Sequence, residues 1–176
     1  MSGRFNILSL SGGGFLGLYT VSVLAELEEA AGGPIARHFD LMAGTSIGGI
    51  IALGLAAEVP AATIKAAFER NGRDIFSNRP APTSWWGTVR DLARFVHKPK
   101  YQTDALRWTI VELVGESTRI GDLKHPVIIP TINLTKAKPQ IFKTPHHPEF
   151  RTDLYLKVVD VALATVGRRL IFRSRK

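Results

Sequence analysis

The chain has 176 residues, 45% of them hydrophobic and 22% charged, which fits one globular domain with a sizeable core. It contains no cysteine, so disulfides, zinc–thiolate sites and thiol catalysis are excluded. The net charge of +8 is concentrated in residues 166–176, which hold five basic side chains and no acid. A secretory signal and a membrane-spanning run are both missing from the sequence, so we expect a cytoplasmic protein, with peripheral membrane association left open.

The first third of the chain alternates short apolar runs with segments of helical periodicity. We expect strands at 5–10 and 39–43, and helices at 18–31 and 50–57. Strands that alternate with helices are typical of a mostly parallel sheet covered by helices. The sequence therefore predicts an α/β fold.

The rest of the chain is predicted to be mainly helical at first, and then to form two adjacent strands and a last helix. The ranges are helices at 60–70, 85–97, 104–114 and 156–165, a proline-rich loop at 78–84, and strands at 127–133 and 140–144. The amphipathic segment at 85–97 carries Trp85 and Trp86. These rings suit either a core or a lipid-entry cap.

A Gly-x-Ser-x-Gly motif, Gly44-Thr45-Ser46-Ile47-Gly48, lies between the second expected strand and the following helix. A nucleophilic serine on such a sharp turn requires small flanking residues, because the backbone is strained and closely packed. The helix adds its N-terminal dipole near a developing oxyanion. A serine hydroxyl is a poor nucleophile without a base, so the motif predicts a base elsewhere.

A glycine-rich segment, Ser11-Gly12-Gly13-Gly14-Phe15-Leu16-Gly17, follows the first strand and opens the first helix. Its free backbone N–H groups suit an anion, either a phosphate or a tetrahedral oxyanion. The spacing also matches a dinucleotide fingerprint, but no acid ends a clear second strand about 20 residues later. An oxyanion loop accounts for both motifs, and a nucleotide-binding α/β domain remains the alternative.

The two motifs in this order resemble the patatin-like phospholipase family. The resemblance implies a three-layer α/β fold with a central, mostly parallel sheet, here incomplete at its C-terminus. It implies lipid acyl hydrolysis of a glycerolipid or phospholipid, without metal or organic cofactor. Ser46 would be the nucleophile, with Gly12, Gly13 and Gly14 as oxyanion donors and Gly44, Thr45, Ile47 and Gly48 forming the elbow. Many members have Arg or Lys where this chain has Leu16, a change that backbone donors should tolerate.

The family's catalytic aspartate lies in a downstream Asp-Gly-Gly or Asp-Gly-Ala, and this chain contains neither. The dyad aspartate is therefore unknown, and none of the histidines lies in a context that marks a base. Family members continue after the last helix with a stretch like Ser-x-Ala-Pro-Thr-Tyr-Phe-Pro, whereas this chain continues from Val166 with a basic sequence. We expect residues 1–165 to be the N-terminal part of the phospholipase domain and 166–176 a disordered tail. We expect that a one-base frameshift after Thr165 produced this tail; a true tail that binds anionic lipid is the alternative.

Three functions remain open from the sequence: a lipid acyl hydrolase, a catalytically inactive fragment that binds lipid or protein, and a nucleotide-binding domain. The start of the chain is also similar to bacterial patatin-like effectors that cyclic oligonucleotides activate, so such an activator is an expectation. We expect no nucleic-acid partner, because no recognition motif is present.

Overall fold

The computed structural model describes residues 4–75, 100–133 and 138–167. The predicted loop at 78–84, the predicted helix at 85–97 and all but the first two residues of the predicted tail at 166–176 lie outside the described residues. The elements, including two short 3-10 helices (η), are β1 (Ile7–Leu10), α1 (Leu16–Ala31), η1 (Ile35–His38), β2 (Leu41–Gly44), α2 (Ile47–Ala56), α3 (Ala61–Ile75), α5 (Lys100–Val114), η2 (Ile120–Asp122), β3 (Val127–Asn133), β4 (Lys138–Lys143) and α6 (Val158–Thr165).

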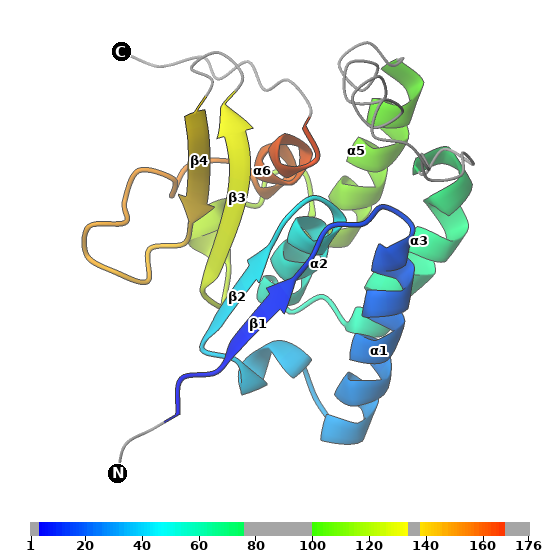
Figure 1. The fold of residues 1–176 in the computed structure, drawn as a ribbon, viewed down its shortest axis with the longest axis horizontal. Helices are drawn as coiled ribbons and strands as arrows, with labels where there is room; N and C mark the ends of the chain where they lie inside the picture. Colours follow the sequence, from blue (N-terminus) through cyan, green and yellow to red (C-terminus); the bar gives the residue numbers. More distant parts are fainter. Residues whose placement is uncertain (1–3, 76–99, 134–137, 168–176) are drawn as a thin grey trace, which may run out of the picture.

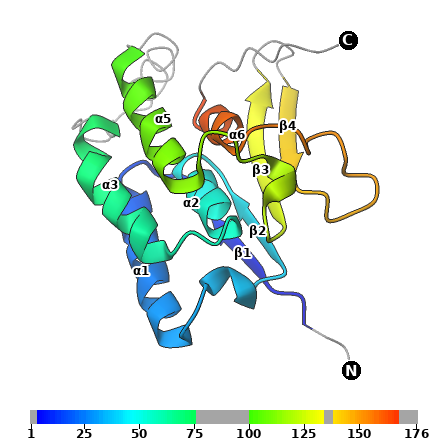
Figure 2. The same ribbon diagram turned by 180° about the vertical axis from the view of Figure 1, so that it is seen from behind.

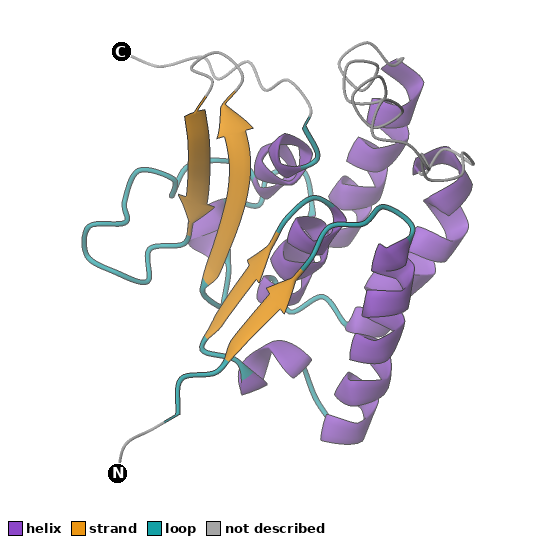
Figure 3. Cartoon of the chain, viewed as in Figure 1, coloured by secondary structure: helices purple, strands orange, loops and turns teal. Residues whose placement is uncertain are grey.

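The four strands form one sheet in the order β1-β2-β3-β4 (Figures 1 and 3). β1, β2 and β3 are parallel, and β4 is antiparallel to β3. Leu10 pairs with Gly44, so β1 and β2 end side by side. The predicted α/β class with a mostly parallel sheet is confirmed, and the loops that follow β1 and β2 emerge together at one edge of the sheet.

Helices pack on one face of the sheet in the described part of the chain. α2 contacts β1, β2 and β3, α6 contacts β3 and α2, and α1, α3 and α5 pack around these two helices (Figure 2). Every residue of α2 is buried, which explains why its sequence is apolar on all sides.

Side chains alternate along the strands between this core and the other face. Met42 and Ile129 are fully buried against the helices. Ile7, Ile132 and Ile141 point the other way and are 55%, 68% and 50% exposed. The sheet therefore presents apolar side chains on the face that the described helices leave open.

Helices α2 and α5 begin earlier than the sequence predicts. α2 starts at Ile47 rather than at residue 50, and α5 starts at Lys100 rather than at 104. Gly48 and Gly49 form the first turn of α2, and glycine has a low helix propensity, so the pattern alone places the start after them. Packing against neighbouring backbone imposes the helix there, as the glycine contacts below show.

Glu58 joins three segments at the edge of the sheet where the parallel strands begin. Its carboxylate accepts hydrogen bonds from Lys124 Nζ at 2.7 Å and Arg37 Nε at 3.0 Å, and lies 3.3 Å from His125 Nε2. The side chain is 16% exposed. Hydrogen bonds from Lys124, then Arg37 and His125, lower the pKa of Glu58 to about 2.

Because this pKa lies below the usual 4.5, the ionised Glu58 stabilises the fold above about pH 4.5. That contribution is lost as the pH falls towards 2. We expect Glu58→Gln to lower the melting temperature at pH 7 and to leave it nearly unchanged at pH 2. Thermal unfolding between pH 2 and 7 measures this, with the exposed Glu26→Gln as the control. Parallel curves for Glu58→Gln and the wild type would contradict it.

Candidate active site

Ser46 lies on the sharp turn between β2 and α2. Its backbone has φ 54° and ψ −127°, and among described non-glycine residues only Ser46 and Glu58 have positive φ. Such a conformation costs about 1–3 kcal/mol and persists only where the surroundings hold it. The half-buried side chain sits at the start of α2, outside its regular turns.

Gly44 and Gly48 have no room for a side chain. A Cβ atom at Gly44 would lie 2.3 Å from the carbonyl oxygen of Gly48. One at Gly48 would lie 2.4 Å from the carbonyl oxygen of Leu10 at the end of β1. Both neighbours are backbone atoms and cannot rotate away, so the two glycines allow β1, β2 and α2 to meet at this turn.

The other two motif residues connect the turn to the glycine-rich loop. The N–H of Thr45 donates to Leu10 O at 3.2 Å, and Thr45 Oγ1 accepts a hydrogen bond from the N–H of Gly12 at 3.1 Å. Ile47 is buried, and its side chain fills the space that a Cβ at Gly17 would need. The two sequence motifs are therefore in direct contact.

The glycine-rich loop borders Ser46. A Cβ at Gly12 would lie 3.0 Å from the Cβ of Ser46, a tight contact, so this approach favours glycine. Gly14 has a φ of 56°, which also favours glycine. The N–H of Gly12 is engaged by Thr45, whereas no partner within the described residues accepts the N–H groups of Gly13 or Gly14. All three glycines are exposed.

A further residue at the turn, Thr165, has no counterpart among the predicted site residues. Its Oγ1 accepts a hydrogen bond from the N–H of Ser46 at 3.0 Å. The two residues are 119 positions apart, and Thr165 is the last residue of α6. No sequence pattern signals this contact.

No described hydrogen bond or ion pair links an acid or a histidine to Ser46. Four of the aspartates have other partners: Asp40 accepts from Asn6 N, Asp122 from Arg119 N, Asp153 from Lys143 N, and Asp160 pairs with Arg107. Asp104 is exposed on α5, and Asp91 and the side chain of Asp74 lie outside the described part. The described structure thus leaves the dyad aspartate unidentified.

The described histidines lie away from the turn. His38 precedes β2 and His125 precedes β3, at the ends where these strands begin. His146 and His147 follow β4, whose end pairs with the start of β3. Ser46 follows the opposite end of β2. His146 instead hydrogen-bonds Thr144 Oγ1 at 2.8 Å, and burial lowers its pKa.

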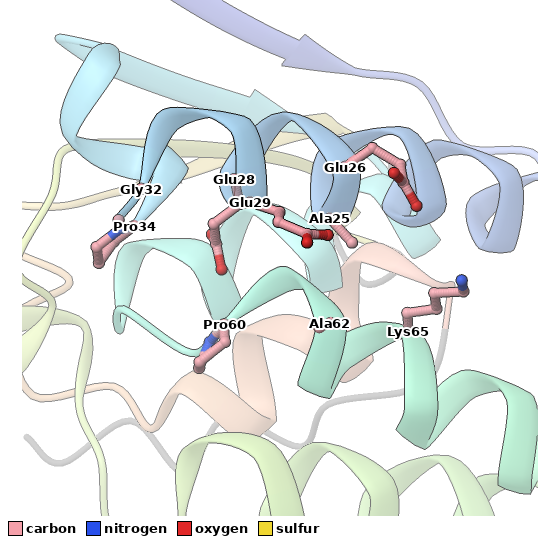
Figure 4. Close-up of a pocket in the computed structure, with 10 residues that line it drawn as sticks. Ala25, Glu26, Glu28, Glu29, Gly32, Pro34, Pro60, Ala62 and Lys65 are labelled. Carbon is pink, nitrogen blue, oxygen red and sulfur yellow. The ribbon is translucent and has the colours of Figure 1, made fainter.

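A pocket of about 650 Å³ lies between the second half of α1 and the start of α3, apart from these motifs (Figure 4). Glu26, Glu28 and Glu29 line it together with Lys65. Glu28 accepts hydrogen bonds from the N–H groups of Ile35 and Ala61 at 3.0 and 2.9 Å. Its carboxylate therefore satisfies the first free N–H of α3, which is a structural role.

Among the described residues, no helix has the length and apolarity needed to cross a bilayer.

The sequence model for patatin-like phospholipases matches residues 8–167. A cGAMP-activated phospholipase of Pseudomonas aeruginosa is 49% identical over 168 residues, covering 96% of this chain and 48% of that protein. One of Vibrio cholerae is 42% identical over 172 residues, covering 94% and 48%. The chain thus spans about half the length of these relatives.

The fold has a solved counterpart in ExoU, in its complex with SpcU from the Pseudomonas aeruginosa type III secretion system. The TM-score is 0.50 at 17% identity, over 94% of this chain and 38% of that chain. The similarity of the fold agrees with the sequence match. This chain belongs to the patatin-like phospholipase family.

Proposed function

We propose that the chain supplies the nucleophile and oxyanion site of a lipid acyl hydrolase, with Ser46 as the attacking residue. The observation that carries this proposal is the strained turn at Ser46 against the glycine-rich loop, at the start of α2. Family membership gives the general hydrolase chemistry, and the geometry supports the individual roles.

In the proposed reaction, Ser46 Oγ attacks the carbonyl carbon of a glycerolipid ester and gives its proton to a base. The exposed N–H groups of Gly13 and Gly14 donate to the resulting oxyanion, and the N-terminus of α2 adds a favourable dipole. Gly12 provides the close approach and, when released from Thr45, a third donor. The carbon–oxygen bond of the ester breaks, and the alcohol leaves with the proton. Water then attacks the acyl-enzyme, which releases the fatty acid and restores Ser46.

The base in this proposal is an aspartate, as the family resemblance implies, and it lies outside the described residues or on another polypeptide. A serine without its base retains only the contribution of the oxyanion site and of binding. Where that base is missing, lipid hydrolysis is therefore expected to be slow.

Vesicles of mixed phosphatidylethanolamine and phosphatidylglycerol test the proposal. The purified chain should release free fatty acid and lysophospholipid, measured by mass spectrometry, above a blank without protein. If a folded chain releases none but sediments with the vesicles, it is an inactive lipid-binding module. If it does neither and a nucleotide raises its melting temperature, the chain is better explained as a nucleotide-binding domain than as a hydrolase.

We also propose that a cyclic oligonucleotide regulates the lipid hydrolysis. The support is that several relatives bear the name cGAMP-activated phospholipase. Adding cGAMP to the vesicle assay should raise fatty acid release, with linear dinucleotide as the control. An equal rate with both compounds would contradict activation of this chain.

A further inference from the structure

The hydroxyl of Thr165 joins the nucleophile turn to the sheet. Oγ1 accepts from the N–H of Ser46 at 3.0 Å and donates to the carbonyl oxygen of Pro130 at 2.9 Å. Ser46 follows β2, Pro130 lies within β3, and Thr165 ends α6. One side chain therefore connects three elements.

Thr165 lies beside the part of β3 with which β2 does not pair. β2 pairs with β3 only at Val127 and Ile128, whereas β3 continues to Asn133. The nitrogen and the carbonyl of one strand residue point to the same side, so the side of Pro130 that lacks an N–H faces Thr165. The Thr165 hydroxyl thus links the backbone of Ser46 to β3 at a point where β2 no longer pairs with β3.

The methyl group of Thr165 fixes the approach of α6 to the turn. A Cβ at Gly49 would lie 2.9 Å from Thr165 Cγ2, so Gly49 allows the helix end to reach Ser46. Thr165 therefore contacts Ser46, the residue whose backbone is strained at φ 54°. A strained residue keeps its conformation only when neighbouring contacts impose it.

We propose that Thr165 is a positioning residue that holds the backbone of Ser46 in its strained conformation. This inference rests on the proposed function for its catalytic consequence. Because the N–H of Ser46 is committed to Thr165, it does not serve as an oxyanion donor in the proposed reaction.

Three variants separate this role from general packing. Thr165→Val keeps the shape and the methyl group but loses both hydrogen bonds, and Thr165→Ser keeps the hydroxyl. Thr131→Val is the matched control: Thr131 Oγ1 donates to Ala164 O at 2.8 Å, so it also joins β3 to α6 but does not touch Ser46.

Hydrogen exchange of the Ser46 amide, followed by NMR, tests the contact whether or not the chain is active. Thr165→Val should accelerate it about fivefold or more relative to wild type and to Thr131→Val, and Thr165→Ser should restore it. Equal acceleration in both valine variants, or no rescue by serine, would overturn the proposal.

The rate of labelling by a fluorophosphonate tests the catalytic consequence. Thr165→Val should slow labelling of Ser46 about tenfold, with Thr131→Val near the wild type, because small displacements of a nucleophile are costly. If the wild type is not labelled at all, the proposed function of this chain fails while the exchange result still decides the anchoring. Normal labelling of Thr165→Val would refute the positioning role.

Discussion

Replacing Ser46 with alanine is expected to abolish covalent labelling by a fluorophosphonate and, where the catalytic base is present, to lower fatty acid release by about 1000-fold or more. The oxyanion N–H groups stay in place in this variant, but no atom remains to form the acyl-enzyme. Gel-based labelling and mass spectrometry of the modified peptide measure the first effect, and the vesicle assay measures the second.

Ser22→Ala is a suitable control, because Ser22 Oγ donates to Leu18 O within α1 and lies apart from the turn. Ser46→Gly offers a second test, because its expected effects on stability and on labelling are opposite in sign. Glycine adopts positive φ without strain, so this variant should gain about 1 kcal/mol in unfolding free energy while it loses labelling. Persistent labelling of Ser46→Ala, or labelling on another serine, would remove Ser46 from its proposed role.

A large loss of stability is expected from Gly48→Ala. The new methyl group would lie 2.4 Å from Leu10 O and 2.7 Å from Ser11 O, and both contacts are backbone atoms. Relief requires β1 and α2 to separate, which we expect to cost about 3 kcal/mol. The melting temperature should fall by about 10 °C, and circular dichroism measures it.

Gly33→Ala serves as the matched control, because a Cβ at Gly33 would meet nothing within 4 Å. Its unfolding free energy should stay within about 0.5 kcal/mol of the wild type. A Gly48→Ala variant as stable as Gly33→Ala would show that β1 and α2 are less tightly packed than described.

The order of the strands and helices could be predicted from the sequence, because apolar periodicity is a local property. Strand β3 was predicted with its exact bounds, 127–133. The start of α2 was wrong by three residues, because Gly48 and Gly49 have low intrinsic preference for a helix and are held in one by contacts with other segments.

The sequence by itself also determined which segments we propose to carry the chemistry, since Gly-x-Ser-x-Gly and a glycine run after a strand have steric requirements that short motifs record. Only the tertiary structure decided how they are connected: Gly12 donates to Thr45, and Thr165 holds Ser46 from 119 residues away. Such hydrogen bonds depend on the register of the sheet and on where α6 docks. No local pattern of residues encodes either.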